Sequence, residues 1–210
     1  VYRQRGTLAL ALRSIPLQVP TFESLLLPPV AKSLAELERG LVLIVGAAGN
    51  GKSSTLAAMI NHINQTRRVH IVTIEDPIEF LHADALATVS QREIGFDTQS
   101  YAAALKNAMR EAPDVIMIGE IRDRETMEIA LTAAETGHVV FSTLHTISAS
   151  QSVNRVIGMF SNEEEPQIRQ RLADTLRYVI SQRLAPKIGG GRVMVSEIMG
   201  ANLRTRETIL

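Results

Sequence analysis

Residues 46–54 read Gly-Ala-Ala-Gly-Asn-Gly-Lys-Ser-Ser and directly follow the apolar run Leu-Val-Leu-Ile-Val at 41–45. Their spacing is G-x-x-x-x-G-K-S. Glycine allows a loop to turn with positive φ and to bring its amides close to a ligand. Consecutive amides, the start of a helix and a lysine together form a cradle for phosphate groups. The stretch therefore predicts a phosphate-binding loop; a glycine-rich turn without a ligand is the alternative.

Within this loop, Lys52 is expected to reach the β and γ phosphates of a nucleotide, and the Ser53 hydroxyl to bind Mg²⁺. The other residues of the loop would contact the phosphates mainly through their backbone amides. The residues predicted to bind the nucleotide are Gly46, Ala47, Ala48, Gly49, Asn50, Gly51, Lys52, Ser53 and Ser54.

The rest of the chain alternates between apolar runs and helical patterns. Strands are predicted at 41–45, 69–74, 114–119 and 138–144, and helices at 30–37, 52–64, 100–112, 124–135, 149–160 and 163–180. A hairpin is expected at 183–199, a strand within 1–15, and a proline-punctuated linker at 16–30 with a short helical piece at 22–27. Strands that alternate with helices predict an α/β fold with a mostly parallel sheet covered on both faces.

Composition excludes several classes of protein. The 210 residues carry no net formal charge and few aromatic side chains, which argues against a motor that tracks along nucleic acid. The chain contains no cysteine, so it has neither disulfides nor thiolate zinc sites, and this suits a reducing cytosol. No apolar run approaches the roughly 20 residues that span a bilayer. Because the chain begins at Val1 and stops at Leu210, we expect it to be part of a longer protein.

Carboxylates follow two further apolar strands. The run "DVIMIGE" ends in Glu120, and "TIEDPIEF" carries Glu75, Asp76 and Glu79. The carboxyl ends of strands in an open α/β sheet are where ligands bind. Three carboxylates so close together repel one another unless a cation or hydrogen-bond donors compensate, as a metal-bound nucleotide would. A solvated loop glutamate at 120, and a solvated acidic turn set by Pro77, are the alternatives.

Two histidines flank the strand in "TGHVVFSTLHT". A lone histidine is usually structural, which is the interpretation favoured for His138. His145 lies at the carboxyl end of its strand, on the same sheet edge as the phosphate loop. It could hydrogen-bond a γ phosphate or transmit its presence.

Together, and in this order, these stretches resemble the secretion ATPase superfamily, and within it the type IV pilus retraction (twitching motility) ATPases. The resemblance rests on "GLVLIVGAAGNGKSSTLAAMI", "TIEDPIEF", "QREIGFDTQSYAAALKNAMREAPDVIMIGEIRD", "AAETGHVVFSTLHT" and "ISQRLAPKIGGGRV". It implies a RecA-like ATPase domain at 31–210, truncated at its carboxyl end, preceded by the linker. Residues 1–15 would be the last strand of an amino-terminal PAS-like domain.

The resemblance also implies roles for the site residues. Lys52 and Ser53 match the phosphate and magnesium contacts, and Glu120 matches the Walker B glutamate beside the metal. Glu79 matches the glutamate that orients or deprotonates the attacking water, and His145 matches the histidine-box residue. An arginine from a neighbouring domain or subunit would face the γ phosphate. The candidates are Arg13 first, then Arg3, with Arg110, Arg122 and Arg155 as alternatives; a solvated surface role remains open for each.

The implied protein is a homo-hexameric motor that uses ATP and Mg²⁺. It would act on an inner-membrane platform protein from the cytoplasmic side, without inserting into the membrane and without nucleic acid. The absence of cysteine rules out the four-cysteine zinc module of the extension and type II secretion ATPases. This favours the retraction branch. A related type II or type IV secretion ATPase, or a pilus-assembly ATPase, remains an alternative, as does a nucleotide-dependent binding module that hydrolyses little.

Two departures from the family pattern stand out. The loop has Ala47-Ala48 and Asn50 where the family usually has Pro-Thr and Ser. The carboxyl-terminal stretch "GANLRTRETIL" at 200–210 replaces a motif linked to retraction. The second departure leaves open whether the protein retracts pili itself or serves in an accessory role.

Overall fold

The computed structural model describes residues 1–12, 15–16 and 18–210. Its main feature is a seven-stranded sheet in the order β5-β4-β6-β7-β3-β8-β9. The strands are β3 (Gly40–Val45), β4 (His70–Glu75), β5 (Thr88–Glu93), β6 (Val115–Ile118), β7 (Val139–Leu144), β8 (Leu176–Pro186) and β9 (Arg192–Gly200). All neighbouring pairs are parallel except β8 with β9. The expected α/β fold with a mostly parallel sheet is confirmed.

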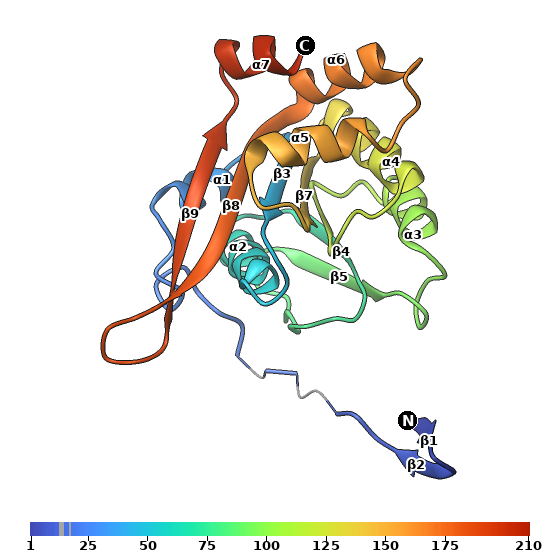
Figure 1. Ribbon diagram of the computed structural model, residues 1–210, viewed down its shortest axis with the longest axis vertical. Coiled ribbons are helices and arrows are strands. Elements are labelled where there is room, and N and C mark those ends of the chain that lie inside the picture. Colours follow the sequence, from blue (N-terminus) through green and yellow to red (C-terminus); the bar gives the residue numbers. More distant parts are fainter. Residues whose placement is uncertain (13–14, 17) are drawn as a thin grey trace.

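Helices cover both faces of this sheet (Figure 1). One face packs against α1 (Val30–Ala35) and α2 (Lys52–Thr66), with Ile44, Ile71 and Phe141 in the shared core. The other face packs against α3 (Tyr101–Ala108), α4 (Arg124–Glu135), α5 (Ala149–Ile157), α6 (Glu165–Thr175) and α7 (Leu203–Ile209). None of the described helices is long and apolar enough to cross a bilayer.

The register of the parallel ladders positions the candidate site. Val45 pairs with Leu144, and Ile118 pairs with both Ile74 and Ser142. The carboxyl ends of β3, β4, β6 and β7 therefore reach one edge of the sheet. The loops that follow these strands carry all four motifs singled out in the sequence.

The amino-terminal region differs from expectation. Residues 1–15 contain an exposed hairpin of β1 (Tyr2–Gln4) and β2 (Thr7–Ala9), not a single strand. Arg5 and Gly6 both adopt positive φ, so the chain reverses direction between two strand-like halves. In Figure 1 this hairpin lies apart from the sheet. Its assignment to a PAS-like domain, and the proposed boundaries at 15 and 30, stay predictions.

Several local predictions were wrong. Residues 22–27 form turns and no helix, since Leu26 has φ 52° and Pro28 follows. The helix predicted to run to residue 180 ends at Thr175, because the chain from Leu176 onward forms β8, which pairs with β3. Strand β5 and helix α7 were not anticipated. The sequence of β5, Thr-Val-Ser-Gln-Arg-Glu, is mostly polar because it forms an edge of the sheet.

Candidate nucleotide-binding site

The phosphate loop connects β3 to α2 as the sequence predicted, and its glycines are required by the backbone. Gly46, Gly49 and Gly51 have φ of 148°, 77° and 79°. A Cβ on Gly46 would lie 2.4 Å from the carbonyl oxygen of Gln182 on β8. Strand β8 therefore packs so closely behind the loop that a side chain at position 46 has no room.

Asn50 attaches the loop to β8 by two hydrogen bonds. Its side-chain oxygen accepts from the Leu184 amide at 3.2 Å, and its carbonyl accepts from the Gln182 side chain at 2.6 Å. Gln182 is only 1% exposed. An asparagine that departs from the family pattern thus has a structural role here, which no local signal in the sequence indicated.

Lys52 lies inside the loop with its side chain folded back over it. The residue is 7% exposed, and its Nζ donates to the carbonyls of Gly46 at 2.8 Å and Ala47 at 3.2 Å. Burial lowers the pKa of Lys52, while the carboxylates of Glu120 and Glu79 act in the opposite direction. A desolvated cation with weak carbonyl partners is suited to bind an anion such as phosphate.

The start of α2 adds further donors. Gly51, the residue before the helix, adopts left-handed φ and has no side chain with which to cap the first turn. The first amides of a helix have no partner within it, and the helix dipole favours negative charge there. The loop, the helix start and Lys52 therefore fit the phosphates of a nucleotide.

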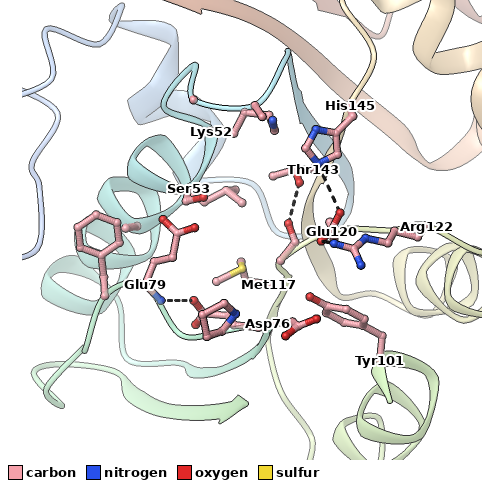
Figure 2. Close-up of a pocket in the computed structure, with 18 residues that line it drawn as sticks. Lys52, Ser53, Asp76, Glu79, Tyr101, Met117, Glu120, Arg122, Thr143 and His145 are labelled. Carbon is pink, nitrogen blue, oxygen red and sulfur yellow. Dashed lines mark hydrogen bonds and ion pairs between the residues drawn. The ribbon is translucent and has the colours of Figure 1, made fainter. Parts of the chain in front are cut away.

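The four motifs line one cavity of about 330 Å³. Figure 2 shows Lys52 and Ser53 on one side of it, Glu79 from the loop after β4, and Glu120 and His145 from the ends of β6 and β7. All of these predicted site residues are thus brought together around one cavity.

Glu120 is held by neighbours from two strand ends. Its side chain, 13% exposed, forms an ion pair with Arg122, and its Oε2 lies 3.4 Å from Nε2 of His145. The Thr143 hydroxyl donates to the Gly119 carbonyl at 2.7 Å and ties β7 to this turn. Glu120 is therefore not a solvated loop glutamate, and His145 contacts it directly.

The three carboxylates after β4 occupy different environments. Glu75 is 8% exposed, and burial raises its pKa despite hydrogen bonds from Thr73 and Gln91. Asp76 is exposed, whereas Glu79 is partly buried at the cavity wall. The backbone amide of Glu79 donates to Glu75 Oε2 at 3.4 Å. The cluster is thus an ordered turn around a buried carboxyl group, in which Glu79 lines the cavity and acts on the charge of Lys52.

The arginine candidates are dispersed. Arg13 lies outside the described residues. Arg3 on β1, Arg110 after α3 and Arg155 on α5 are exposed, while Arg122 lines the cavity beside Glu120 of its own chain.

His138, for which a structural role was favoured, contacts the carbonyl of Ala133 through Nδ1 at 2.9 Å.

Tyr101 is a cavity residue that the sequence did not indicate. It is the first residue of α3, after the Ser100 cap, and a Cβ on Gly119 would lie 3.3 Å from its hydroxyl. Figure 2 shows the ring opposite Glu120 and Asp76. Burial, followed by the charges of Glu120 and Asp76, raises the pKa of its hydroxyl, so it stays protonated as a donor.

The same cavity offers oxygen donors that suit a Mg²⁺ ion held jointly by the protein and by bound phosphates. Among the described residues, no three His, Asp or Glu side chains gather into a metal site of their own. Mg²⁺ usually takes one or two protein oxygens and completes its shell with phosphates and water. Ser53 and Glu120, on opposite sides of the cavity, are suitable donors for that arrangement.

Comparisons with known proteins identify the family of this chain. A family model described as type II/IV secretion system protein matches residues 26–199. The type IV pilus retractation ATPase PilT of Pseudomonas aeruginosa is 52% identical over 187 residues, 89% of this chain and 54% of the relative. The twitching motility protein of Neisseria gonorrhoeae is 49% identical over 202 residues, 96% of this chain and 54% of the relative.

A solved structure is similar as well. The crystal structure of the pilus retraction motor PilT with bound ADP matches with a TM-score of 0.95 at 50% identity, over 98% of this chain and 60% of that one. The chain spans about half the length of the curated relatives it matches. Because the family model covers most of the chain, the protein belongs to the type II/IV secretion system protein family.

Proposed function

We propose that this chain is the nucleotide-binding core of an ATPase that hydrolyses Mg²⁺–ATP and drives retraction of type IV pili. The observation that carries the proposal is the convergence of four strand-end motifs on one cavity, with a buried lysine facing two glutamates. The names of the relatives, a pilus retraction ATPase and a twitching motility protein, give the biological setting.

Each side chain has a distinct task in this proposal. Lys52 and the amides at the start of α2 bind the phosphates, while Ser53 and Glu120 hold Mg²⁺. A Mg²⁺ ion held there would supply positive charge to the phosphates. Glu79 orients the attacking water and accepts its proton. His145, whose Nε2 lies 3.4 Å from Glu120 Oε2, contacts the γ phosphate or transmits its presence to Glu120.

The assembly and location follow the same proposal. Subunits form a homo-hexamer in which an arginine from a neighbour, with Arg13 as first candidate, completes the site. The motor acts at the cytoplasmic face of the inner membrane on a platform protein. The carboxyl-terminal stretch forms α7, anchored by Arg169 donating to the Ile209 carbonyl at 2.8 Å. Because its sequence departs from the retraction motif, an accessory role beside another retraction ATPase is the alternative.

Phosphate release by the full-length protein with Mg²⁺–ATP tests the chemistry. We expect Glu79→Gln to keep nucleotide affinity and to lose about 100-fold or more in turnover, since its task concerns the water. Glu120→Gln is expected to lose turnover with a raised Mg²⁺ requirement. Glu125→Gln, an exposed change on α4, is the matched control. Weakened ATP binding without a specific loss of chemistry in Glu79→Gln would contradict the assignment.

Retraction itself needs a second measurement. The gene would be returned to a strain that lacks it, and retraction of fluorescently labelled pili would be recorded. Loss of retraction in the strain and its recovery with the wild-type gene support the motor role. If the strain without the gene retracts its pili normally while the purified protein hydrolyses ATP, the protein is an ATPase but the retraction role is refuted.

A further inference from the structure

The sheet carries an unexpected polar patch beside the cavity. Ile71 on β4 and Val89 on β5 pair with each other and pack in the core on the α2 side. The next pairs along the same face are Thr73 with Gln91 and Glu75 with Glu93. Thr73 and Glu75 are buried all the same. Buried polar groups at core-facing positions cost stability unless each is hydrogen-bonded.

Gln91 satisfies three partners at once. Its Nε2 donates to Glu75 Oε1 at 3.1 Å and to the Phe80 carbonyl at 2.9 Å. Its Oε1 accepts from the His82 amide at 2.8 Å. The two backbone partners lie on the carboxyl side of Glu79, in the loop that places Glu79 at the cavity.

The two glutamates of the patch hold the other side of the same loop. Glu93 Oε2 accepts from the Ile78 amide at 3.0 Å, and Glu75 Oε2 accepts from the Glu79 amide at 3.4 Å. Glu75 Oε1 also accepts from the Thr73 hydroxyl at 2.7 Å. Residues 78–82 are thus fastened by side chains from strands β4 and β5, with Gln91 joined to both the loop and Glu75.

We propose that Gln91 is a positioning residue for Glu79, acting through the backbone of residues 80–82 and through Glu75. The inference rests on the proposed function, in which Glu79 acts on the attacking water. An amide is required at this position because the group must donate to a carboxylate and a carbonyl while it accepts from an amide. A misplacement of about 1 Å in a reacting group can cost about 100-fold in rate.

Measurements of turnover and nucleotide affinity in the full-length protein distinguish a positioning role of Gln91 from a role in general stability. Gln91→Ala is expected to lower kcat by about 10- to 100-fold, while the dissociation constant of a fluorescent ATP analogue changes less than about 3-fold. Thr88→Ala, an exposed change at the start of β5, is the matched control and should retain wild-type turnover. Equal losses of kcat, affinity and thermal stability would assign Gln91 a merely structural role.

Gln91→Glu gives a pH signature that a structural role does not predict. When ionised, the introduced carboxylate presents only acceptors to Phe80 and Glu75; when protonated, it regains one donor. The groups around it are Glu75, Glu79, Glu93 and His82, and the three carboxylates favour its protonated form. The kcat of Gln91→Glu relative to wild type is therefore expected to be highest near pH 6 and to fall toward pH 8. A ratio that is flat with pH would overturn the proposal.

Hydrogen exchange of residues 76–86 tests the fastening without any need for turnover. Gln91→Ala should speed exchange in this segment and leave β3 and β7 unchanged. If wild type itself does not hydrolyse ATP, the proposed function fails, and this measurement still decides whether Gln91 holds the loop. Unchanged exchange, or faster exchange with wild-type kcat in an active enzyme, would refute the positioning role.

Discussion

At the scale of single residues, Lys52 combines burial with charge. Its ammonium group is held by two loop carbonyls, and two carboxylates across the cavity counteract the decrease of its pKa. A desolvated lysine whose ammonium group is held by neutral carbonyls is costly in the free protein. A phosphate bound in the loop would offset this cost, because it places a negative charge beside the ammonium group.

Lys52→Ala is therefore expected to abolish turnover and to weaken ATP binding without loss of folding, because it removes the cation of the phosphate cradle. Phosphate release and titration with a fluorescent ATP analogue measure both effects. Lys32→Ala, an exposed lysine on α1, is the control and should behave as wild type. Turnover at the parent rate in Lys52→Ala would show that the site is misassigned.

His82 gives a pH dependence of stability. Burial lowers its pKa to about 4 from 6.5, and its Nδ1 is a buried atom without a hydrogen-bond partner in the described chain. Between these values the unfolded chain binds a proton that the folded chain does not. Lowering the pH from about 6.5 to about 4 therefore destabilises the fold, by up to about 1.4 kcal/mol per pH unit from this group.

Urea unfolding of wild type and His82→Phe at several pH values measures this effect. In the variant, the free energy of unfolding should fall less steeply as the pH is lowered from about 6.5 to about 4. Glu75, with a raised pKa, has the opposite sign and is present in both proteins, so the difference between them isolates His82. Identical slopes in the two proteins would contradict the assignment.

At the scale of secondary structure elements, β8 is in close contact with the phosphate loop and fixes its position. Strand β8 begins well before the predicted hairpin and pairs with β3. It supports the loop from behind through Gln182 and Leu184. The loop conformation thus depends on a strand that is distant in sequence, since Gln182 and its partner Asn50 are 132 residues apart.

Gly46→Ala tests this contact, with Gly137→Ala as the matched control. Both glycines have positive φ, but only Gly46 has a neighbour within 4 Å of an added Cβ. Gly137→Ala should therefore lower the free energy of unfolding by about 1–2 kcal/mol from backbone strain alone. Gly46→Ala should cost more and also weaken ATP binding. Equal losses of stability in both variants, measured by urea unfolding, would refute the steric argument.

At the scale of the whole molecule, the described cavity has few cations for phosphoryl transfer. Lys52 is buried in the loop, and Arg122 is paired with Glu120. A transferring γ phosphate generally needs more positive charge, and an arginine from another subunit is a common source. We therefore expect activity to require an oligomer and specific activity to rise with protein concentration.

Mixed rings give the sharper experiment. Arg13→Ala and Lys52→Ala are each expected to be inactive alone. If Arg13 acts across a subunit interface, some sites in a mixture pair an intact loop with an intact arginine, and partial activity returns. An inactive mixture would count against Arg13 as the donor, and full turnover by a monomer would exclude the ring mechanism.

The sequence by itself determined the local features of this protein. The loop at 46–54 required glycines because of its backbone angles, and the apolar runs identified β3, β4, β6 and β7. Since parallel strands bring their carboxyl ends to one edge, the strand order was enough to bring Glu120, His145 and the carboxylates after β4 to the edge where Lys52 lies. The choice of Glu79 among those carboxylates came from the family resemblance. The loop and the strands could be inferred because each depends on residues that are neighbours in the chain, and the shared edge follows from the general geometry of parallel sheets.

Only the tertiary structure decided the rest. Residues 176–180 have a helical pattern in sequence, yet they form strand because β3 offers an open edge. The polar strand β5 gains its place from pairing with β4, and Gln91 gains its partners from a loop nine to eleven residues earlier. Tyr101 and Asn50 likewise acquire their contacts from distant strands. Such contacts depend on which surfaces meet after folding, and no periodicity within a segment encodes them.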